Sequence, residues 1–285
     1  MSQVQSASGE RNFAKSVGYG LLFGGAFLAS ILFVKDLMMG LLAVVIAAGA
    51  WEISTALRKA GWYVPRVPVT VGSLAIMPAT YYGGPIWQWA LTAAMIFVLV
   101  IWRTVHLLWE RRESITQSFN KSVRDFSASA FVVIYLPLTA SFTRLLLSRP
   151  DGAGGVIQFV VPTAMIDTFG YLVGRKIGKH KIAPGVSPKK SLEGLIASIL
   201  AGIISSVALM VLVLHHDWYW GLVTGSAVLV TAVFGDLAES LIKRDLGVKD
   251  MSSWLPGHGG VMDRMDSMLP SGLAVYFIAT LCFAL

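Results

Sequence analysis

The stretch from Leu192 to Leu214, LEGLIASILAGIISSVALMVLVL, has one charged residue in 23 positions. A helix of about 20 apolar residues is long enough to cross the roughly 30 Å hydrocarbon layer of a bilayer. The stretch therefore predicts a membrane-spanning helix. Because other segments of the chain share its length and hydropathy, the sequence predicts a bundle of such helices.

The composition of the whole chain agrees with this interpretation. Of its 285 residues, 55% are hydrophobic and 14% are charged, whereas charged residues make up about 25% of an ordinary soluble domain. The net charge of +7 does not imply a nucleic-acid partner, because membrane proteins concentrate Lys and Arg in their cytoplasmic loops. The single cysteine, Cys282, excludes both a disulfide framework and a cysteine metal site.

Hydropathy predicts an all-α polytopic membrane protein with about nine transmembrane helices. The third and fourth are short, interrupted by Pro78 and joined at Gly83-Gly84-Pro85. The nine spans are expected at about 14–34, 37–57, 67–83, 86–102, 126–147, 155–174, 192–214, 217–242 and 267–285.

The distribution of basic residues predicts the orientation. If the N-terminus is cytoplasmic, the inside segments hold 20 of the 23 lysines and arginines, and only Lys35, Arg144 and Arg149 fall outside. The positive-inside rule predicts this kind of excess. We therefore expect the C-terminus outside, and a multi-pass protein of the cell inner (plasma) membrane.

The same layout suggests two parts. Residues 1–125 form N-terminal transmembrane helices and a cytoplasmic connector. Residues 126–285 form a catalytic transmembrane region with cytoplasmic loops at 175–191 and 243–266. Within the first part, segment 103–125 fits an interfacial amphipathic helix and a solvated connector equally well.

Four acidic residues fall within predicted spans, where an ionisable side chain is costly and normally faces a paired or wet interior. Glu52 lies near the inner end of its span, where pairing with water or a loop arginine is expected, and Asp167 lies about two turns from the inner end of another. Asp236 and Glu239 share one helix face, where two like charges require a cation or a basic partner. A metal or substrate role and an ion pair with Lys243 both fit that spacing.

The loop after residue 242 carries the densest polar cluster. Its glycine-rich turn lets backbone N–H groups approach an anion, and flanking Lys and Arg match phosphate oxygens. Carboxylates in the same loop suit Mg²⁺, which is bound by few carboxylates together with substrate phosphates. These features predict a metal–polyphosphate site made by Lys243, Arg244, Lys249, Asp250, His258, Gly259, Gly260, Asp263, Arg264 and Asp266.

The inside loop 175–191 is also rich in lysine and arginine and contains Lys189 and Lys190. It fits a loop that sets topology and attracts anionic lipid. Its position between two acid-bearing spans also fits a phosphate-binding loop.

Residues 240–266, SLIKRDLGVKDMSSWLPGHGGVMDRMD, resemble the signature of phosphatidate cytidylyltransferases, also called CDP-diacylglycerol synthases. Twelve fixed positions of that pattern are matched within 27 residues, beginning at Ser240. The segments DTFGYLVGRKIGKHK (167–181) and SPKKSLEG (187–194) are similar to the same family. The resemblance covers about 167–285 well, whereas the earlier spans match in hydropathy only.

The resemblance implies that the phosphate of phosphatidate attacks the α-phosphorus of CTP, so that pyrophosphate leaves and CDP-diacylglycerol forms. It implies Mg²⁺ as cofactor, bound by Asp236 and Asp263 with Glu239 as a further candidate, and leaves a second, monovalent cation open. Lys243 and Arg264 would join Asp236 and Asp263 as catalytic groups. The nucleotide and phosphates would be contacted by Asp167, Lys189, Lys190, Ser240, Arg244, Lys249, Asp250, His258, Gly259, Gly260 and Asp266. The partners would be CTP and bilayer phosphatidate, and a homodimer stays open.

Two other functions fit part of the pattern. A CTP-dependent lipid kinase acting on a polyprenol-type alcohol would use a similar metal–nucleotide site but would release CDP. A cation-coupled transporter would place its acids near the bilayer midplane on broken helices. The acids here lie toward the inner ends of their spans and continue into a basic, glycine-rich loop, which favours a phosphate site over an ion path.

Overall fold

The computed structural model describes residues 35–110, 115–183, 187–252 and 259–282, together with Gly25 and Trp254. Its helices are α2 (Lys35–Lys59), α3 (Arg66–Glu110), α4 (Ile115–Val133), α5 (Thr139–Leu147), α6 (Gly152–Ile177), α7 (Leu192–Leu212), α8 (Trp218–Asp245) and α9 (Met268–Cys282). A π-helix, η1 (Ile134–Leu138), joins α4 to α5, and a 3-10 helix, η2 (Met262–Arg264), precedes α9.

Six of these helical segments are long and apolar enough to cross a membrane: Asp36–Lys59, Arg66–Trp109, Phe119–Leu147, Gly152–Ile177, Leu192–Leu212 and Trp218–Asp245. A shorter apolar helix covers Met268–Leu281. Length and composition thus agree with the predicted multi-pass membrane protein. The predicted first span, 14–34, lies outside the described residues except for Gly25.

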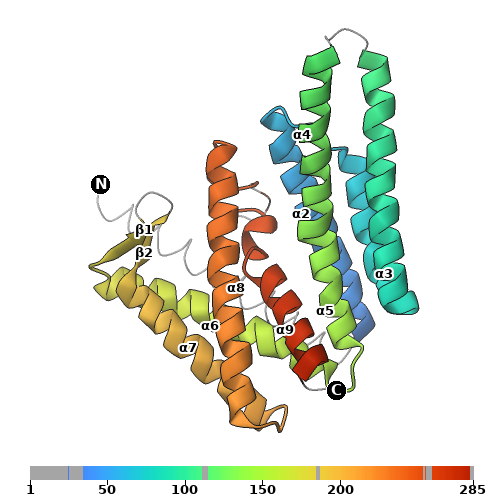
Figure 1. Ribbon diagram of the computed structural model, residues 1–285. Coiled ribbons are helices and arrows are strands. Elements are labelled where there is room, and N and C mark those ends of the chain that lie inside the picture. Colours follow the sequence, from blue (N-terminus) through green and yellow to red (C-terminus); the bar gives the residue numbers. More distant parts are fainter. Residues whose placement is uncertain are drawn as a thin grey trace.

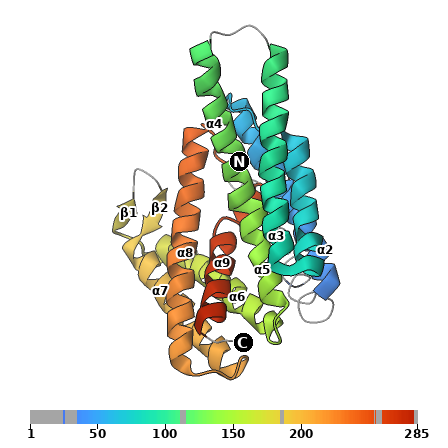
Figure 2. The same ribbon diagram turned by 45° about the vertical axis from the view of Figure 1, so that its right-hand side comes forward.

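Helix α3 contains the predicted third and fourth spans and reverses direction between them. Gly84 interrupts it with φ 63° and ψ −153°, a backbone region that is essentially restricted to glycine. The two halves lie side by side (Figures 1 and 2), and Met95 of the second half packs so closely on Gly72 that no Cβ fits there. The sequence break at residues 83–85 is therefore a hairpin bend.

The predicted fifth span is longer than expected, because helix runs from Ile115 through η1 to Leu147. Pro137 lies within η1, and since proline has no N–H it removes one ordinary helical hydrogen bond. The chain adapts with the wider turn of a π-helix, and the Thr139 hydroxyl donates to the Ile134 carbonyl five residues back at 2.7 Å. Residues 115–125 of the expected amphipathic or connecting segment are helical.

Two short strands correct the all-α expectation. β1 (Lys181–Ala183) pairs antiparallel with β2 (Ser187–Ser191), with Lys181 opposite Ser191. The hairpin ends where the Ser191 side chain accepts a hydrogen bond from the Gly194 N–H at 3.2 Å and caps α7. The predicted basic loop 175–191 therefore begins in the last turn of α6 and contributes the two paired strands β1 and β2 next to α7.

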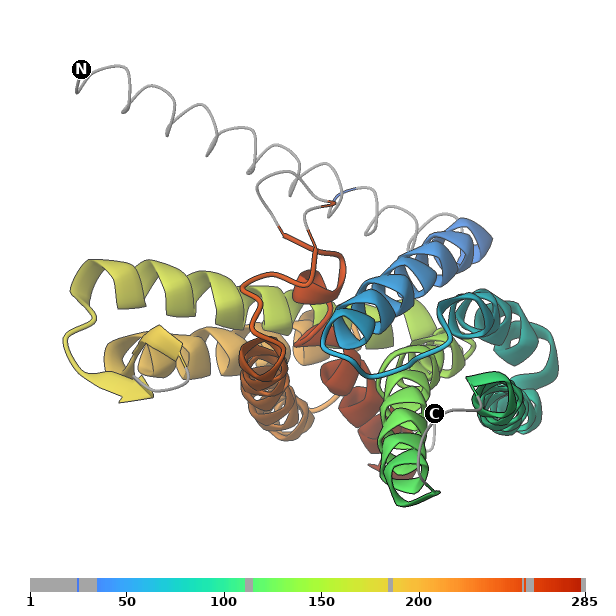
Figure 3. The ribbon, with the colours of Figure 1, turned by 90° about the horizontal axis from the view of Figure 1, so that it is seen from above.

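The helices form two groups joined by α8 and α9 (Figures 1 and 2). One group contains α2, α3, α4 and α5, and the other contains α6, α7 and the β1–β2 hairpin. Seen from above, α6 and α7 run across the view while α4 and α8 are nearly end on (Figure 3). The core includes the fully buried Met38, Ile46 and Ile53 of α2 and Leu136 of η1, so one face of α2 packs into the interior.

Gly84→Ala should destabilise the protein by about 1–3 kcal/mol, because a Cβ strains this backbone conformation. Thermal unfolding in detergent measures the change. Gly40→Ala is the matched control: Gly40 lies within α2 with no atom within 4 Å of the added Cβ, and alanine favours a helix interior over glycine. Equal stability of the two variants would contradict the assigned bend.

Candidate functional site

Five acidic residues meet at one end of the bundle. Asp167 comes from α6, Asp236 and Glu239 come from α8, and Asp263 and Asp266 come from η2 and the turn after it. Asp167 is exposed on its helix and lies within electrostatic range of Asp236 and Asp266. The structure thus brings together acids that lie far apart in the chain.

Asp236 and Glu239 share a helix face but differ in environment. Glu239 is fully buried and accepts a hydrogen bond from Lys243 at 2.9 Å, four residues on. This is the ion pair that the spacing allowed as an alternative to a metal role. Asp236 has a side chain 37% exposed and forms an ion pair with Lys190 of β2. The strand β2 thus supplies a cation to the acidic cluster.

Lys243 links the two buried acids. Its ammonium group lies 2.9 Å from a carboxylate oxygen of Glu239 and 2.9 Å from Oδ1 of Asp263. One cation therefore ties the last turn of α8 to η2. Because both carboxylates are almost completely buried, neither could remain charged there without a partner of this kind.

Asp263 organises the loop that contains it. Its Oδ2 accepts hydrogen bonds from the N–H groups of Gly260 at 2.7 Å and Met251 at 3.1 Å. Burial alone would raise the pKa of Asp263, but the Gly260 N–H and Lys243 hold it below its ordinary value. Gly259 has φ 80°, a left-handed conformation that glycine adopts without strain. Gly259 and Gly260 thus lie against a carboxylate of their own loop.

Asp266 lies deeper in the cluster. It is buried, and its Oδ1 accepts from the Ser267 N–H at 2.7 Å. Burial and then the charge of Asp236 raise the pKa of Asp266 above its ordinary value. Asp263 and Asp266, three residues apart, therefore have pKa shifts of opposite direction.

Glu52 of α2 enters the same loop from across the bundle. Its carboxylate accepts from the Ser252 hydroxyl at 2.5 Å, the Val261 N–H at 3.0 Å and the Met262 N–H at 2.9 Å. The expected partner was water or a loop arginine, but the structure supplies a serine and two backbone amides. An acid within an apolar span pointed to Glu52, whereas nothing in the local sequence pointed to Ser252.

The other predicted residues lie around this centre or outside the described ranges. Arg244, Lys249, Asp250 and Arg264 are exposed, and Ser240 is partly buried. Lys189 precedes Lys190 in β2, but its side chain, like all of His258, lies outside the described residues. A second buried pair that the sequence did not signal joins Arg103 to Asp125 at 2.7 Å, at the end of α3 and in α4.

A metal ion requires ligands that converge. Within the described ranges, no three His, Cys, Asp or Glu side chains are placed to hold a metal ion. Asp236 fits a cation best, because it is partly exposed and its Lys190 partner is a flexible side chain. Asp263 fits less well, since Lys243 and two amides already contact it.

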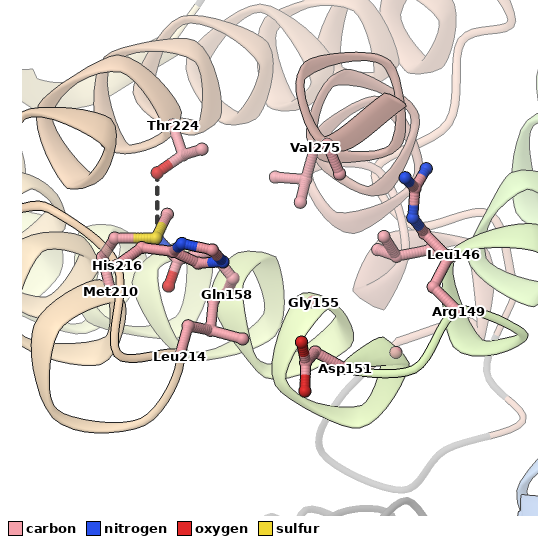
Figure 4. Close-up of a pocket in the computed structure, with 12 residues that line it drawn as sticks. Leu146, Arg149, Asp151, Gly155, Gln158, Met210, Leu214, His216, Thr224 and Val275 are labelled. Carbon is pink, nitrogen blue, oxygen red and sulfur yellow. Dashed lines mark hydrogen bonds between the residues drawn. The ribbon is translucent and has the colours of Figure 1, made fainter. Parts of the chain in front are cut away.

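A small cavity lies at the opposite end of the bundle (Figure 4). It has a volume of about 30 Å³ and is lined by residues that include Gln158, Met210 and Thr224. The Gln158 amide donates to the Thr224 hydroxyl at 2.8 Å and to the Ser206 hydroxyl at 2.7 Å. These bonds tie α6 to α7 and α8, and the cavity is far too small for a nucleotide.

Comparison with known proteins identifies the family of this chain. Residues 15–282 match the model of the cytidylyltransferase family. A phosphatidate cytidylyltransferase of Mycobacterium bovis is 32% identical over 98% of this chain and 92% of its own. That of Mycobacterium leprae is 34% identical over 95% and 88%, and that of Thermotoga maritima is 35% identical over 51% and 56%. The chain belongs to the cytidylyltransferase family.

Lys243→Ala should cost about 3–5 kcal/mol of stability, because it leaves two buried carboxylates without their cation. Lys190→Ala should cost below about 1 kcal/mol, since its pair with Asp236 is solvent-exposed. Unfolding in detergent, followed by circular dichroism, compares the two variants. Similar losses would show that the Lys243 bridge does not hold the site together.

Asp266→Asn should stabilise the metal-free protein at neutral pH. When the pKa of a carboxyl group is higher in the folded than in the unfolded protein, its contribution to stability is complete below the pKa of the unfolded state. That contribution is lost as the pH rises through the pKa of the folded state. As the pH falls from neutral toward the pKa of an unfolded aspartate, protonation of Asp266 should therefore stabilise the wild-type protein. The variant should lack this contribution to stability. Melting curves between about pH 4 and pH 8 in EDTA test this; parallel curves would contradict it.

Proposed function

We propose that this protein is a phosphatidate cytidylyltransferase that converts CTP and phosphatidate into CDP-diacylglycerol and pyrophosphate. The observation that carries the proposal is the cluster of acids and lysines at one end of an apolar helix bundle. It is supported by similarity, over nearly the whole chain, to relatives named for that activity.

In this reaction an oxygen of the phosphatidate phosphate forms a bond to the α-phosphorus of CTP. The bond between that phosphorus and the oxygen bridging to the β-phosphate breaks, and its electron pair leaves with pyrophosphate. A phosphate monoester is ionised at neutral pH, so no strong general base is required. The main obstacle is the repulsion between two polyanions, which positioned cations reduce.

Different residues of the cluster contact the phosphates and position the other groups. Lys190 and Arg264 present positive charge at the edge of the cluster, where they can contact CTP phosphates. Lys243 keeps Asp263 in place, and Asp263 in turn holds the Gly260 N–H, so that these groups are positioned before the nucleotide binds. Such preorganisation lowers the cost of aligning the reacting groups. Lys189, Ser240, Arg244, Lys249, Asp250, His258 and Gly259 are proposed to complete the nucleotide and phosphate contacts.

Mg²⁺ belongs to the proposal, with Asp236 as first ligand and Asp263 and Glu239 as further candidates. A bound divalent cation would screen the phosphates and stabilise charge on the leaving pyrophosphate. Asp236 would hold it once Lys190 turns toward a phosphate. The acids around Asp236 favour a cation, because their charges repel one another at close range.

The lipid substrate accounts for the position of the site. Phosphatidate keeps its acyl chains in the bilayer, so the site must open sideways near the headgroups, and the exposed Asp167 on a membrane helix fits such an opening. We further propose nine spans, a cytoplasmic N-terminus and a cytoplasmic site in the inner membrane. The division into residues 1–125 and a catalytic region 126–285 is part of this proposal.

The released product tests the reaction. Purified protein with CTP and phosphatidate in mixed micelles should release pyrophosphate and form CDP-diacylglycerol, only with Mg²⁺ present. Asp236→Asn should reduce kcat by at least about 100-fold, since removing one electrostatic contact to the transition state costs this much. Release of CDP would identify a kinase instead.

A matched control distinguishes the loss of the Asp236 carboxylate as a metal ligand from unfolding of the protein. Asp217→Asn alters an exposed acid just before α8, at the other end of that helix, and should keep wild-type activity. Full activity of Asp236→Asn would remove Asp236 from the proposed metal site.

A further inference from the structure

The contacts of Glu52 connect two distant parts of the chain. The residue lies in α2, while its three hydrogen-bond donors lie about 200 residues later, at Ser252, Val261 and Met262. Its side chain is 2% exposed. Helix α2, which carries none of the family's signature positions, therefore contacts the loop that does.

These contacts form a cap on η2. The N–H groups of Val261 and Met262 lie where η2 begins, and the first N–H groups of a helix have no partner within it. A carboxylate that accepts from both satisfies them and also matches their partial positive charge. Asp263 follows Met262 directly, so the position of Glu52 fixes the start of the turn that carries Asp263 and Arg264.

The fit between Glu52 and the loop is tight. A Cβ on Gly260 would lie 2.7 Å from Oε2 of Glu52 and 3.1 Å from Oδ2 of Asp263. The two carboxylates thus enclose Gly260 from two sides and leave no space for a side chain. Since Gly260 also donates its N–H to Asp263, a shift of Glu52 would move the partner of Asp263.

We propose that Glu52 is a positioning residue for nucleotide binding: by its bonds to Ser252, Val261 and Met262 it fixes the start of η2, so that Asp263 and Arg264 meet the phosphates of CTP. Glu52 itself does not touch the substrate. This inference rests on the proposed function. It makes the N-terminal helices part of the active-site architecture as well as membrane anchors.

The decisive variant is Glu52→Gln, which keeps the length of the side chain. Its amide nitrogen is a donor, so at least one contact to an N–H or hydroxyl donor is lost. The KM for CTP should rise about 10-fold to 100-fold, because displaced groups make weaker charge-assisted contacts to its phosphates. The KM for phosphatidate should stay close to the wild-type value, because the inference assigns these groups to the nucleotide.

Asp125→Asn is the matched control. Asp125 is equally buried, also accepts from a distant backbone N–H, that of Tyr63 at 3.0 Å, and pairs with Arg103. None of these contacts involves Ser252, Val261 or Met262. A purely structural role for Glu52 predicts the same outcome for both variants: less folded protein with an unchanged KM for CTP. Our inference predicts a raised KM for Glu52→Gln alone.

A measurement without turnover separates this inference from the proposed reaction. Hydrogen exchange followed by mass spectrometry should show about 10-fold faster exchange in peptides containing the Val261 and Met262 amides in Glu52→Gln, because their acceptor is weakened. Asp125→Asn should leave those peptides unchanged. If the wild type does not form CDP-diacylglycerol while this exchange pattern holds, the proposed reaction fails and the loop contact stands.

Ser252→Ala covers the case in which Glu52→Gln does not fold. It removes the hydroxyl donor and keeps the carboxylate with both amide contacts. The KM for CTP should rise by a smaller factor, about two-fold to five-fold, because a hydrogen bond to a charged group is lost. Where Glu52→Gln does not fold, a wild-type KM for CTP in Ser252→Ala overturns the inference. Where Glu52→Gln folds, wild-type exchange or a wild-type KM for CTP in that variant overturns it.

Discussion

Charged groups inside an apolar helix bundle must find partners within the protein. This constraint is strongest at the Lys243 bridge, in which Lys243 pairs with the buried Glu239 and Asp263. Glu239 and Asp263 are almost completely buried, and one ammonium group lies 2.9 Å from each. Taking such ions out of water is costly unless attraction and hydrogen bonds compensate. The bridge therefore makes the end of α8 and the η2 turn interdependent, and the rest of the site is built around that junction.

The same constraint explains the glycine-rich turn. A turn near a membrane needs partners for its backbone N–H groups as much as for its side chains. Asp263 accepts from Gly260 and Met251, and Glu52 accepts from Val261 and Met262. Two carboxylates thus satisfy four amides. These backbone amides in the described part of the turn are satisfied by carboxylates of the same protein.

The part of the site that was predictable is local in sequence. The i, i+3 spacing of Asp236 and Glu239 and the i, i+4 spacing to Lys243 place these side chains on one face of a helix, however that helix packs. The break at residues 83–85 was also visible, because adjacent glycines and a proline punctuate a helix. The β1–β2 hairpin was missed, since its polar strand residues lack the apolar alternation that marks a strand.

Hydropathy by itself determined that this protein is a helical membrane protein, and loop motifs by themselves predicted a phosphate-type site after α8. They do so because both signals depend on neighbours along the chain. The tertiary structure alone decided which charges meet: Lys190 with Asp236, Arg103 with Asp125, and Glu52 with the η2 turn. These partners come from different helices, and their distances depend on how the helices pack, which no local pattern specifies.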